Sequence, residues 1–217
     1  MRIAELSRRT GVPVPTIKYY LREGLLEPGA RTSPNQAFYG ESHVRRLRLI
    51  RALVDIGGQS VGATKSVLKG IDEPGISVHA ALGAAQYAMT TTRAPVVDEA
   101  WKTAARTVAE LVAKRGWDVK ETNPSQQAMT EVVATLLRLG QDHWLAVLDT
   151  YTDAAESIAE RELAELAGRA DIDDITERAI VVTVLGDVLL SALRRLAQEH
   201  VSRTHFDTVC GTPAQET

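Results

Sequence analysis

Cysteine is almost absent from this 217-residue sequence: only Cys210 is present, in a tail rich in Gly, Thr and Pro. A single cysteine cannot form a disulfide within the chain, and it argues against a site in which several thiolates bind a metal. No apolar run approaches the length of a membrane span, and the opening MRIAEL lacks the apolar segment of a signal peptide. We therefore expect a cytoplasmic protein with no membrane partner.

Catalytic motifs are scarce as well. The segment Gly58-Gln59-Ser60-Val61-Gly62 matches G-x-S-x-G, but a nucleophile elbow needs a strand before the serine and a parallel sheet around it. Here the segment joins two predicted helices, so we expect Ser60 to cap the second one. The chain also lacks the Glu-x-x-His pairs of a di-iron helical bundle. We predict no enzymatic activity, no metal site and no cofactor.

The charge is distributed unevenly along the chain. Residues 1–70 hold 12 Lys/Arg and 5 Asp/Glu, a net charge of +7, whereas residues 71–217 hold 13 Lys/Arg and 23 Asp/Glu, a net charge of −10. A basic block suits a polyanion, because neutralising phosphates releases counterions. The alternative is a solvated charged surface. The asymmetry predicts two parts with different tasks.

Helical periodicity dominates both parts. Gly11 and Gly24 each follow an expected helix and are suited to end it. Segment 27–39, with two prolines, a glycine and an asparagine, predicts a loop or small hairpin. The expected helices lie at about 3–10, 15–23, 41–56, 61–68, 77–92, 96–116, 124–139, 142–168 and 173–203.

The first two helices, joined by a glycine-containing turn, predict a helix-turn-helix. Hydroxyl groups and cations, which suit phosphate oxygens and base edges, lie near one face of the second helix. These residues are Thr16, Lys18, Tyr19 and Arg22. Tyr20 adds an apolar ring with a phenol that can reach phosphate. The alternative for Tyr20 is inward packing with Ile17 and Leu21, and Tyr19 has the same alternative.

A series of spaced features resembles the DNA-binding domain of the MerR family of bacterial transcription regulators. They are IAEL in the first helix, TGV at the turn, Lys18 before the paired tyrosines, GLL after the second helix, Arg31-Thr32, and Tyr39 before the segment GESHVRRLRLIRALVDIGG. The resemblance runs without a gap from residue 1 to about 70. It implies a winged helix-turn-helix, with the helix from Pro15 in the major groove and segment 27–39 as a wing on the backbone. Candidate wing contacts are Arg31, Asn35, Gln36 and Tyr39.

The sequence departs from the family pattern at several positions. Pro13 stands where the family often has a capping Ser or Thr, and Asn35-Gln36-Ala37 stands where Gly-Tyr-Arg is common. Asn35 can still adopt a left-handed turn. Ala37, however, stands where the family commonly has an arginine that can contact phosphate. The arginines of segment 41–56 either reach flanking phosphates or lie solvated. The family's metal-sensing cysteines are missing.

The acidic C-terminal part holds few aromatic side chains. Tyr87, Trp101, Trp117, Trp144 and Tyr151 lie close in sequence to methionines and a histidine. They form either ordinary helical core or a pocket for an apolar or aromatic small molecule. A pocket would lie between the helices expected at 96–116, 124–139 and 142–168. Its candidate residues are Trp101, Trp117, Met129, His143, Trp144 and Tyr151.

The last expected helix has a wide apolar face. This face comprises Val181, Val184, Leu185, Val188, Leu189, Ala192, Leu193 and Leu196. Together with helix 142–168 it loosely resembles the dimerising helix pair of TetR-type regulators. It indicates a two-fold subunit interface or, alternatively, an intrachain bundle core. Dimerisation through helix 77–92 remains a further option.

We therefore expect an all-α protein with a small wing hairpin. Residues 1–72 form a winged helix-turn-helix, 73–95 a linker and connecting helix, 96–205 a helical ligand-sensing and dimerisation domain, and 206–217 a flexible tail. The predicted function is a ligand-responsive, homodimeric transcription regulator on pseudo-palindromic promoter DNA, which the resemblance implies is distorted for RNA polymerase. The alternative is a ligand-independent architectural DNA-binding protein whose helical domain only dimerises.

Overall fold

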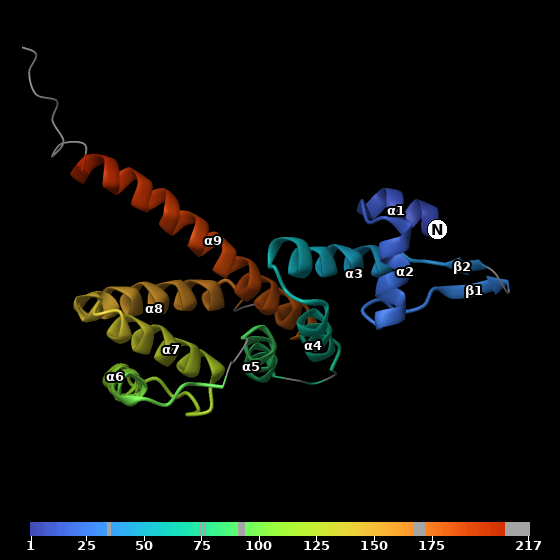
Figure 1. The fold of residues 1–217 in the computed structure, drawn as a ribbon. Helices are drawn as coiled ribbons and strands as arrows, with labels where there is room; N and C mark the ends of the chain where they lie inside the picture. The colour runs from blue at the N-terminus through green and yellow to red at the C-terminus, as the bar shows by residue number, and fades with distance from the viewer. Residues whose placement is uncertain (34–35, 74, 76, 91–93, 167–171, 207–217) are drawn as a thin grey trace, which may run out of the picture. The chain divides into compact units, whose positions relative to one another are not determined.

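The computed structural model describes residues 1–33, 36–73, 75, 77–90, 94–166 and 172–206 (Figure 1). Within them the fold is helical apart from one two-stranded hairpin, which confirms the predicted fold class. Two packing units can be distinguished, Met1–Gln59 with Val181–Thr217, and Ser60–Ile180. Among the described residues, no helix is long and apolar enough to cross a membrane. The predicted tail lies outside them from residue 207 onward.

The first unit contains the predicted helix-turn-helix and wing. In chain order it contains α1 (Ile3–Thr10), α2 (Val14–Glu23), β1 (Ala30–Ser33), β2 (Gln36–Phe38), α3 (Glu41–Arg51) and the π-helix η1 (Ala52–Ile56). Each helix turns an apolar stripe inward, as amphipathic helices do in a small domain. The centre of the resulting core consists of Leu6, Ile17, Leu25, Leu47 and Ile50, all of which are buried.

The helix predicted over 41–56 changes its winding at Ala52. The Gly57 N–H donates to the Ala52 carbonyl at 2.9 Å, five residues earlier, which is the spacing of a π-turn. Gly57 also packs closely against α9 (Ile172–Phe206), because a Cβ at this position would overlap Val184 Cγ1 and lie 2.8 Å from the Leu53 carbonyl oxygen. A glycine is therefore required for the close approach.

The second unit is a set of helices followed by a short 3₁₀ segment and a longer helix. Its elements are α4 (Val61–Asp72), α5 (Val78–Met89), α6 (Glu99–Arg115), α7 (Pro124–Arg138), the 3₁₀-helix η2 (Asp142–Val147) and α8 (Leu148–Ala164). α4 packs against α5, and α6 packs against α7. The packing units divide before α4, and the domain boundary expected between residues 72 and 73 stays a prediction.

Side-chain caps fix where these helices begin. Ser60 accepts a hydrogen bond from the Ala63 N–H at 3.1 Å, which confirms its predicted capping role. Asp98 accepts from the Trp101 N–H at 2.8 Å, so α6 begins at Glu99 rather than at the predicted residue 96. The predicted helix 142–168 begins as the 3₁₀ segment η2, and Leu145 of this segment packs on the core between α6 and α7.

Candidate nucleic-acid interface

The turn between α1 and α2 is fixed by local hydrogen bonds. Gly11 ends α1 in the left-handed conformation, with φ of 70°, and its N–H donates to the Ser7 carbonyl. The Ser7 hydroxyl donates to the Val12 carbonyl at 2.6 Å, and the Val12 N–H donates to the Thr10 hydroxyl at 3.3 Å. These bonds set the direction in which α2 leaves the turn.

The second helix separates a buried face from a polar one. α2 begins at Val14 without a side-chain cap, as expected from Pro13. Ile17 and Tyr20 are buried, whereas Lys18 and Arg22 are exposed and Thr16 is partly exposed. Since Lys18 and Arg22 are four positions apart, they lie on the same side of the helix. The structure therefore brings together two of the predicted cationic contacts.

The paired tyrosines have different environments. Tyr19 is partly exposed, and its ring lies 5.9 Å from the Arg22 guanidinium carbon and 6.0 Å from the Tyr20 ring. Tyr20 is only 5% exposed, and burial, followed by the charge of Asp55, raises its pKa. This burial favours the inward-packing alternative for Tyr20. Of the two tyrosines, only Tyr19 has ring surface that a binding partner can contact.

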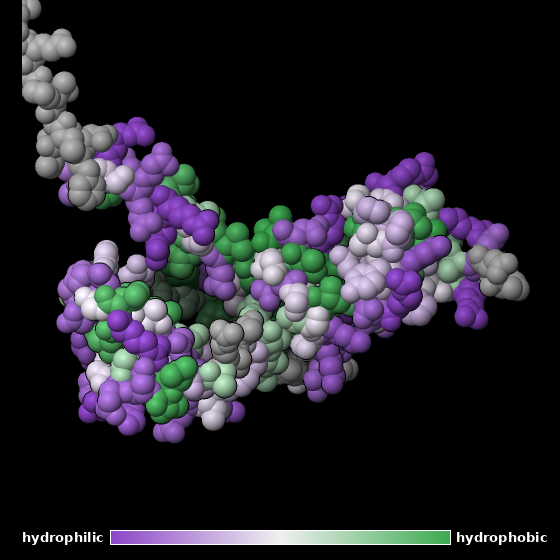
Figure 2. Space-filling view, in the orientation of Figure 1, coloured by the Kyte–Doolittle hydropathy of each residue, from purple (hydrophilic) through white to green (hydrophobic). Residues whose placement is uncertain are grey.

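The wing is a short, irregular antiparallel hairpin. Arg31 pairs with Ala37 and Ser33 with Gln36, and the register shifts between Arg31 and Ser33. The predicted contacts Arg31 and Gln36 are exposed. Asn35 lies outside the described residues. Hydrophilic side chains surround this end of the molecule in Figure 2.

Tyr39 lies at the base of the wing rather than on its surface. The side chain is 6% exposed, its ring meets His43 edge-on at 5.1 Å, and burial raises its pKa. Its backbone N–H donates to the Met1 carbonyl at 2.9 Å, and the Met1 amino group donates to the Tyr39 carbonyl at 2.8 Å. The observed role of Tyr39 is thus to hold the wing to the domain, and a contact with DNA stays a prediction.

Several arginines of the basic block are engaged within the domain. The Arg46 Nε donates to the Leu25 carbonyl at 3.0 Å, and the Arg51 Nη1 donates to the Thr10 carbonyl at 3.2 Å. Arg9 forms a two-pronged ion pair with Glu41 from the start of α3. This pair was missed by sequence reasoning, because 32 positions separate the partners and no local spacing marks them. Fewer cations of residues 1–70 are therefore available to phosphate than their net charge of +7 suggests.

The candidate ligand residues of the C-terminal part are dispersed. Trp101 and Met129 pack against the buried cluster of Ala104, Val108, Val133 and Ala134. His143 and Trp144 lie on η2 with ring centres 5.7 Å apart. Trp144 is 52% exposed and Tyr151 on α8 is 49% exposed. The structure thus brings Trp101 and Met129 to one buried cluster and His143 beside Trp144, and a common ligand site stays a prediction.

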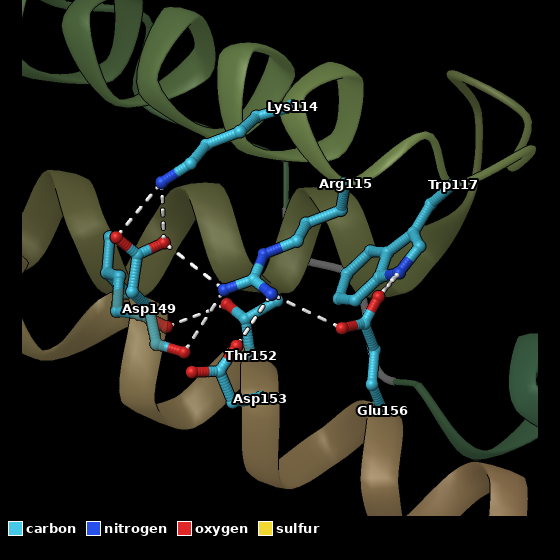
Figure 3. Close-up of polar contacts among 8 residues, drawn as sticks. Lys114, Arg115, Trp117, Asp149, Thr152, Asp153 and Glu156 are labelled. Carbon is cyan, nitrogen blue, oxygen red and sulfur yellow. Dashed lines mark hydrogen bonds and ion pairs between the residues drawn. The ribbon is translucent and has the colours of Figure 1, made fainter.

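The remaining candidate, Trp117, belongs to a polar cluster between α6 and α8 (Figure 3). Its Nε1 donates to Glu156 at 2.6 Å. Arg115 forms ion pairs with Asp149, Asp153 and Glu156 at 3.3, 2.6 and 3.3 Å. These charges raise the pKa of Arg115, with the hydrogen bond to Asp153 as the main cause. The cluster fixes α6 to α8 and gives Trp117 a structural partner.

Comparisons with known proteins place this geometry in a family. The family model described as "MerR HTH family regulatory protein" matches residues 1–71. The HTH-type transcriptional regulator HmrR of Sinorhizobium medicae (strain WSM419) is 40% identical over 57 residues, 26% of this chain and 39% of that protein. A ZntR homolog of Haemophilus influenzae is 44% identical over 50 residues, 23% of this chain and 37% of that protein. The chain thus spans about two fifths of the length of these curated relatives.

A solved structure extends the likeness beyond the first domain. The crystal structure of SCO5550 from Streptomyces coelicolor A3(2), a protein assigned as a transcriptional regulator, is 35% identical. The match covers 95% of this chain and 98% of the SCO5550 chain, with a TM-score of 0.70. The helix-turn-helix, the wing and the sequence matches agree. Residues 1–71 thus form a helix-turn-helix domain of the MerR family of transcription regulators.

Proposed function

We propose that the protein is a homodimeric transcription regulator that binds pseudo-palindromic promoter DNA in the cytoplasm. The observation that carries the proposal is the exposed side of α2, where Lys18 and Arg22 lie one helical turn apart. A helix of this kind, following a tight turn, fits the major groove, and its cations pair with phosphates or guanine edges. Two copies would present two such helices to the two half-sites.

The predicted contacts divide into three roles. Thr16, Lys18, Tyr19 and Arg22 would meet DNA directly from α2. Arg31, Asn35 and Gln36 would meet the backbone from the wing, where contacts set register without reading sequence. Tyr20 and Tyr39, being buried, would act by holding α2 and the wing in place.

A selection experiment tests this proposal. The full-length protein is used to enrich binding sequences from random duplexes, and affinity for the recovered site is measured by fluorescence anisotropy at several salt concentrations. We expect an inverted repeat, and an affinity that falls steeply with salt. Recovery of no preferred sequence, with binding unaffected by Lys18→Ala together with Arg22→Ala, would refute the proposal.

We further propose that a small apolar or aromatic molecule controls the DNA-bound state. Support comes from the exposed rings of Trp144 and Tyr151, since aromatic surface left in water suits an organic ligand. Such a ligand changes the response only if it binds one conformation better, with ~1–3 kcal/mol of coupling as the usual range. The response would be a change in promoter shape that alters how RNA polymerase engages it.

The alternative is an architectural protein that binds DNA without a ligand. The packing of Trp101 and Met129 into a helical core favours it. Tryptophan fluorescence during titration with a compound library separates the two, since Trp101, Trp117 and Trp144 all lie in the second unit. A compound that shifts the emission and changes operator affinity supports sensing. A library without such a compound, together with unchanged DNA bending, supports the alternative.

A further inference from the structure

The C-terminal part of α9 is apolar and exposed. Every residue from Asp187 to His205 is exposed. Six of them are large apolar residues with exposures between 39% and 64%, namely Val188, Leu189, Leu190, Leu193, Leu196 and Val201. Apolar side chains are visible at the surface along this helix in Figure 2. Patches of this kind mark interaction sites in water-exposed proteins.

Three of these six side chains share one face of the helix, whereas Val188, Leu190 and Val201 lie on its flanks. Leu189, Leu193 and Leu196 are spaced i, i+4 and i+7, so they form one face of α9. Arg194 lies about 140° round the helix from Leu189, on the opposite side. Between Leu189 and Leu196 this face therefore carries no charge, and a copy of this stretch meets it without like-charge repulsion; His200 and Arg203 continue the face one and two turns further on.

The other candidate for an interface, α5, packs against α4 along one face. Its Ala81 and Ala85 are buried, and its Ala84 Cβ lies 3.9 Å from the Cβ position of Gly70 in α4. The Tyr87 hydroxyl donates to the Thr122 carbonyl at 3.1 Å. At 12 residues, α5 is about 18 Å long. The buried face of α5 is used within the second unit, and its exposed residues His79, Ala80, Ala84 and Tyr87 include few large apolar side chains.

The packing of α9 also favours a second copy of the chain as the partner that covers its exposed apolar face. From Val181 onward α9 belongs to the same packing unit as α2, and Val184 lies against Gly57. Two chains joined along α9 would thus have their DNA-binding helices linked through one helix each. A closed two-fold interface pairs one patch with itself, which an uncharged leucine face permits.

The exposed apolar area of α9 is also large enough to form the centre of a dimer interface. Leu189, Leu193 and Leu196 together expose on the order of 300 Å², a suitable centre for an interface of about 800 Å² per partner. We propose that a second copy of this chain binds the α9 face of Leu189, Leu193 and Leu196, which makes α9 the dimerisation helix. The inference rests on the proposed function in one respect: binding to two DNA half-sites is the reason why two copies are needed.

The test compares full-length variants by sedimentation equilibrium. Leu189→Glu with Leu193→Glu should weaken dimerisation at least ~100-fold, because two charges per chain would have to be buried. Val96→Glu with Leu139→Glu is the matched control, since both residues are 68% exposed outside the proposed face. The control should remain as dimeric as the natural sequence. Unchanged dimerisation of the α9 variant overturns the inference.

A second variant guards against misfolding. Leu189→Ala with Leu196→Ala introduces the best helix former, and we expect at least ~10-fold weaker dimerisation with unchanged circular dichroism. A natural sequence that is monomeric at micromolar concentration overturns the inference and points to a different partner. Binding to a single half-site is measured on the same variants. Loss of dimerisation with half-site binding retained supports the inference, whereas a dimer that fails to bind DNA contradicts the proposed function alone.

Discussion

The guanidinium carbon of Arg22 lies 5.9 Å from the centre of the Tyr19 ring, within one turn of α2. This arrangement is a cation–π contact, which holds both side chains on the partly exposed side of the helix. The ring of Tyr19 in turn lies 6.0 Å from that of the buried Tyr20. A buried tyrosine, a partly exposed one and an arginine thus form a chain from the core to the surface.

The first prediction follows from this contact. Lys18→Ala and Arg22→Ala should each weaken operator binding, and each should reduce the slope of log affinity against log salt by about 0.9 if it removes one phosphate contact. Lys120→Ala, an exposed lysine of the second unit, is the control and should change neither quantity. Anisotropy at four salt concentrations measures both. Equal slopes in all four proteins would show that these cations do not touch phosphate.

Much of the architecture was predictable because it depends on local sequence. Gly11, Gly24 and Ser60 fix helix ends through conformation or capping within a few residues, and the wing follows from its turn-forming composition. The 3₁₀ start of α8 was not predictable, since Leu145 responds to the distant core between α6 and α7.

The candidate site was predictable to a smaller extent. The spacing of Lys18 and Arg22 places them on one side of a helix, and the structure agrees. The burial of Tyr39 and the engagement of Arg9 depend on contacts with Met1 and Glu41, more than 30 positions away. Sequence periodicity carries no information about such partners. The basic block therefore identified the correct domain but not which cations remain for DNA.

The second prediction concerns Gly57. Gly57→Ala should lower the free energy of unfolding by about 1–3 kcal/mol, because the added methyl overlaps Val184 and crowds the Leu53 carbonyl. Gly83→Ala is the matched substitution, since Gly83 lies inside α5 with nothing within 4 Å of its Cβ position. It should raise that free energy by about 0.5–1 kcal/mol. Urea denaturation measures both, and the same sign for the two variants would contradict the packing described here.

The third prediction concerns the ion pair between α1 and α3. Arg9 and Glu41 share two hydrogen bonds, and the bond from Arg9 is the main cause of the lowered pKa of Glu41. Arg9→Gln and Glu41→Gln should each destabilise the protein, and the double variant should cost less than the sum of the two. Chemical denaturation gives the coupling. Its decrease with added salt is expected, because both groups are solvent-accessible. An additive double variant would mean that the pair contributes nothing to stability.

The last prediction is a pH dependence at the start of α6. Asp98 accepts hydrogen bonds from Arg138 at 2.9 and 3.1 Å and from the Trp101 N–H at 2.8 Å. Its pKa is lowered from 3.8 to about 2, mainly by the hydrogen bonds from Arg138. Because the folded value lies below the unfolded one, the stabilisation is fully present above about pH 4 and is lost as the pH falls through 2.

The unfolding free energy of the natural sequence should therefore fall more steeply between pH 4 and pH 2 than that of Asp98→Asn. Asparagine is a suitable control because it still caps α6 but cannot change charge. Arg138→Gln should also make the unfolding free energy fall less steeply between pH 4 and pH 2, since it removes the main cause of the lowered pKa of Asp98. Urea denaturation at half-unit pH intervals measures the slopes. Parallel pH profiles for the natural sequence and Asp98→Asn would show that this carboxylate titrates alike in the folded and unfolded chains.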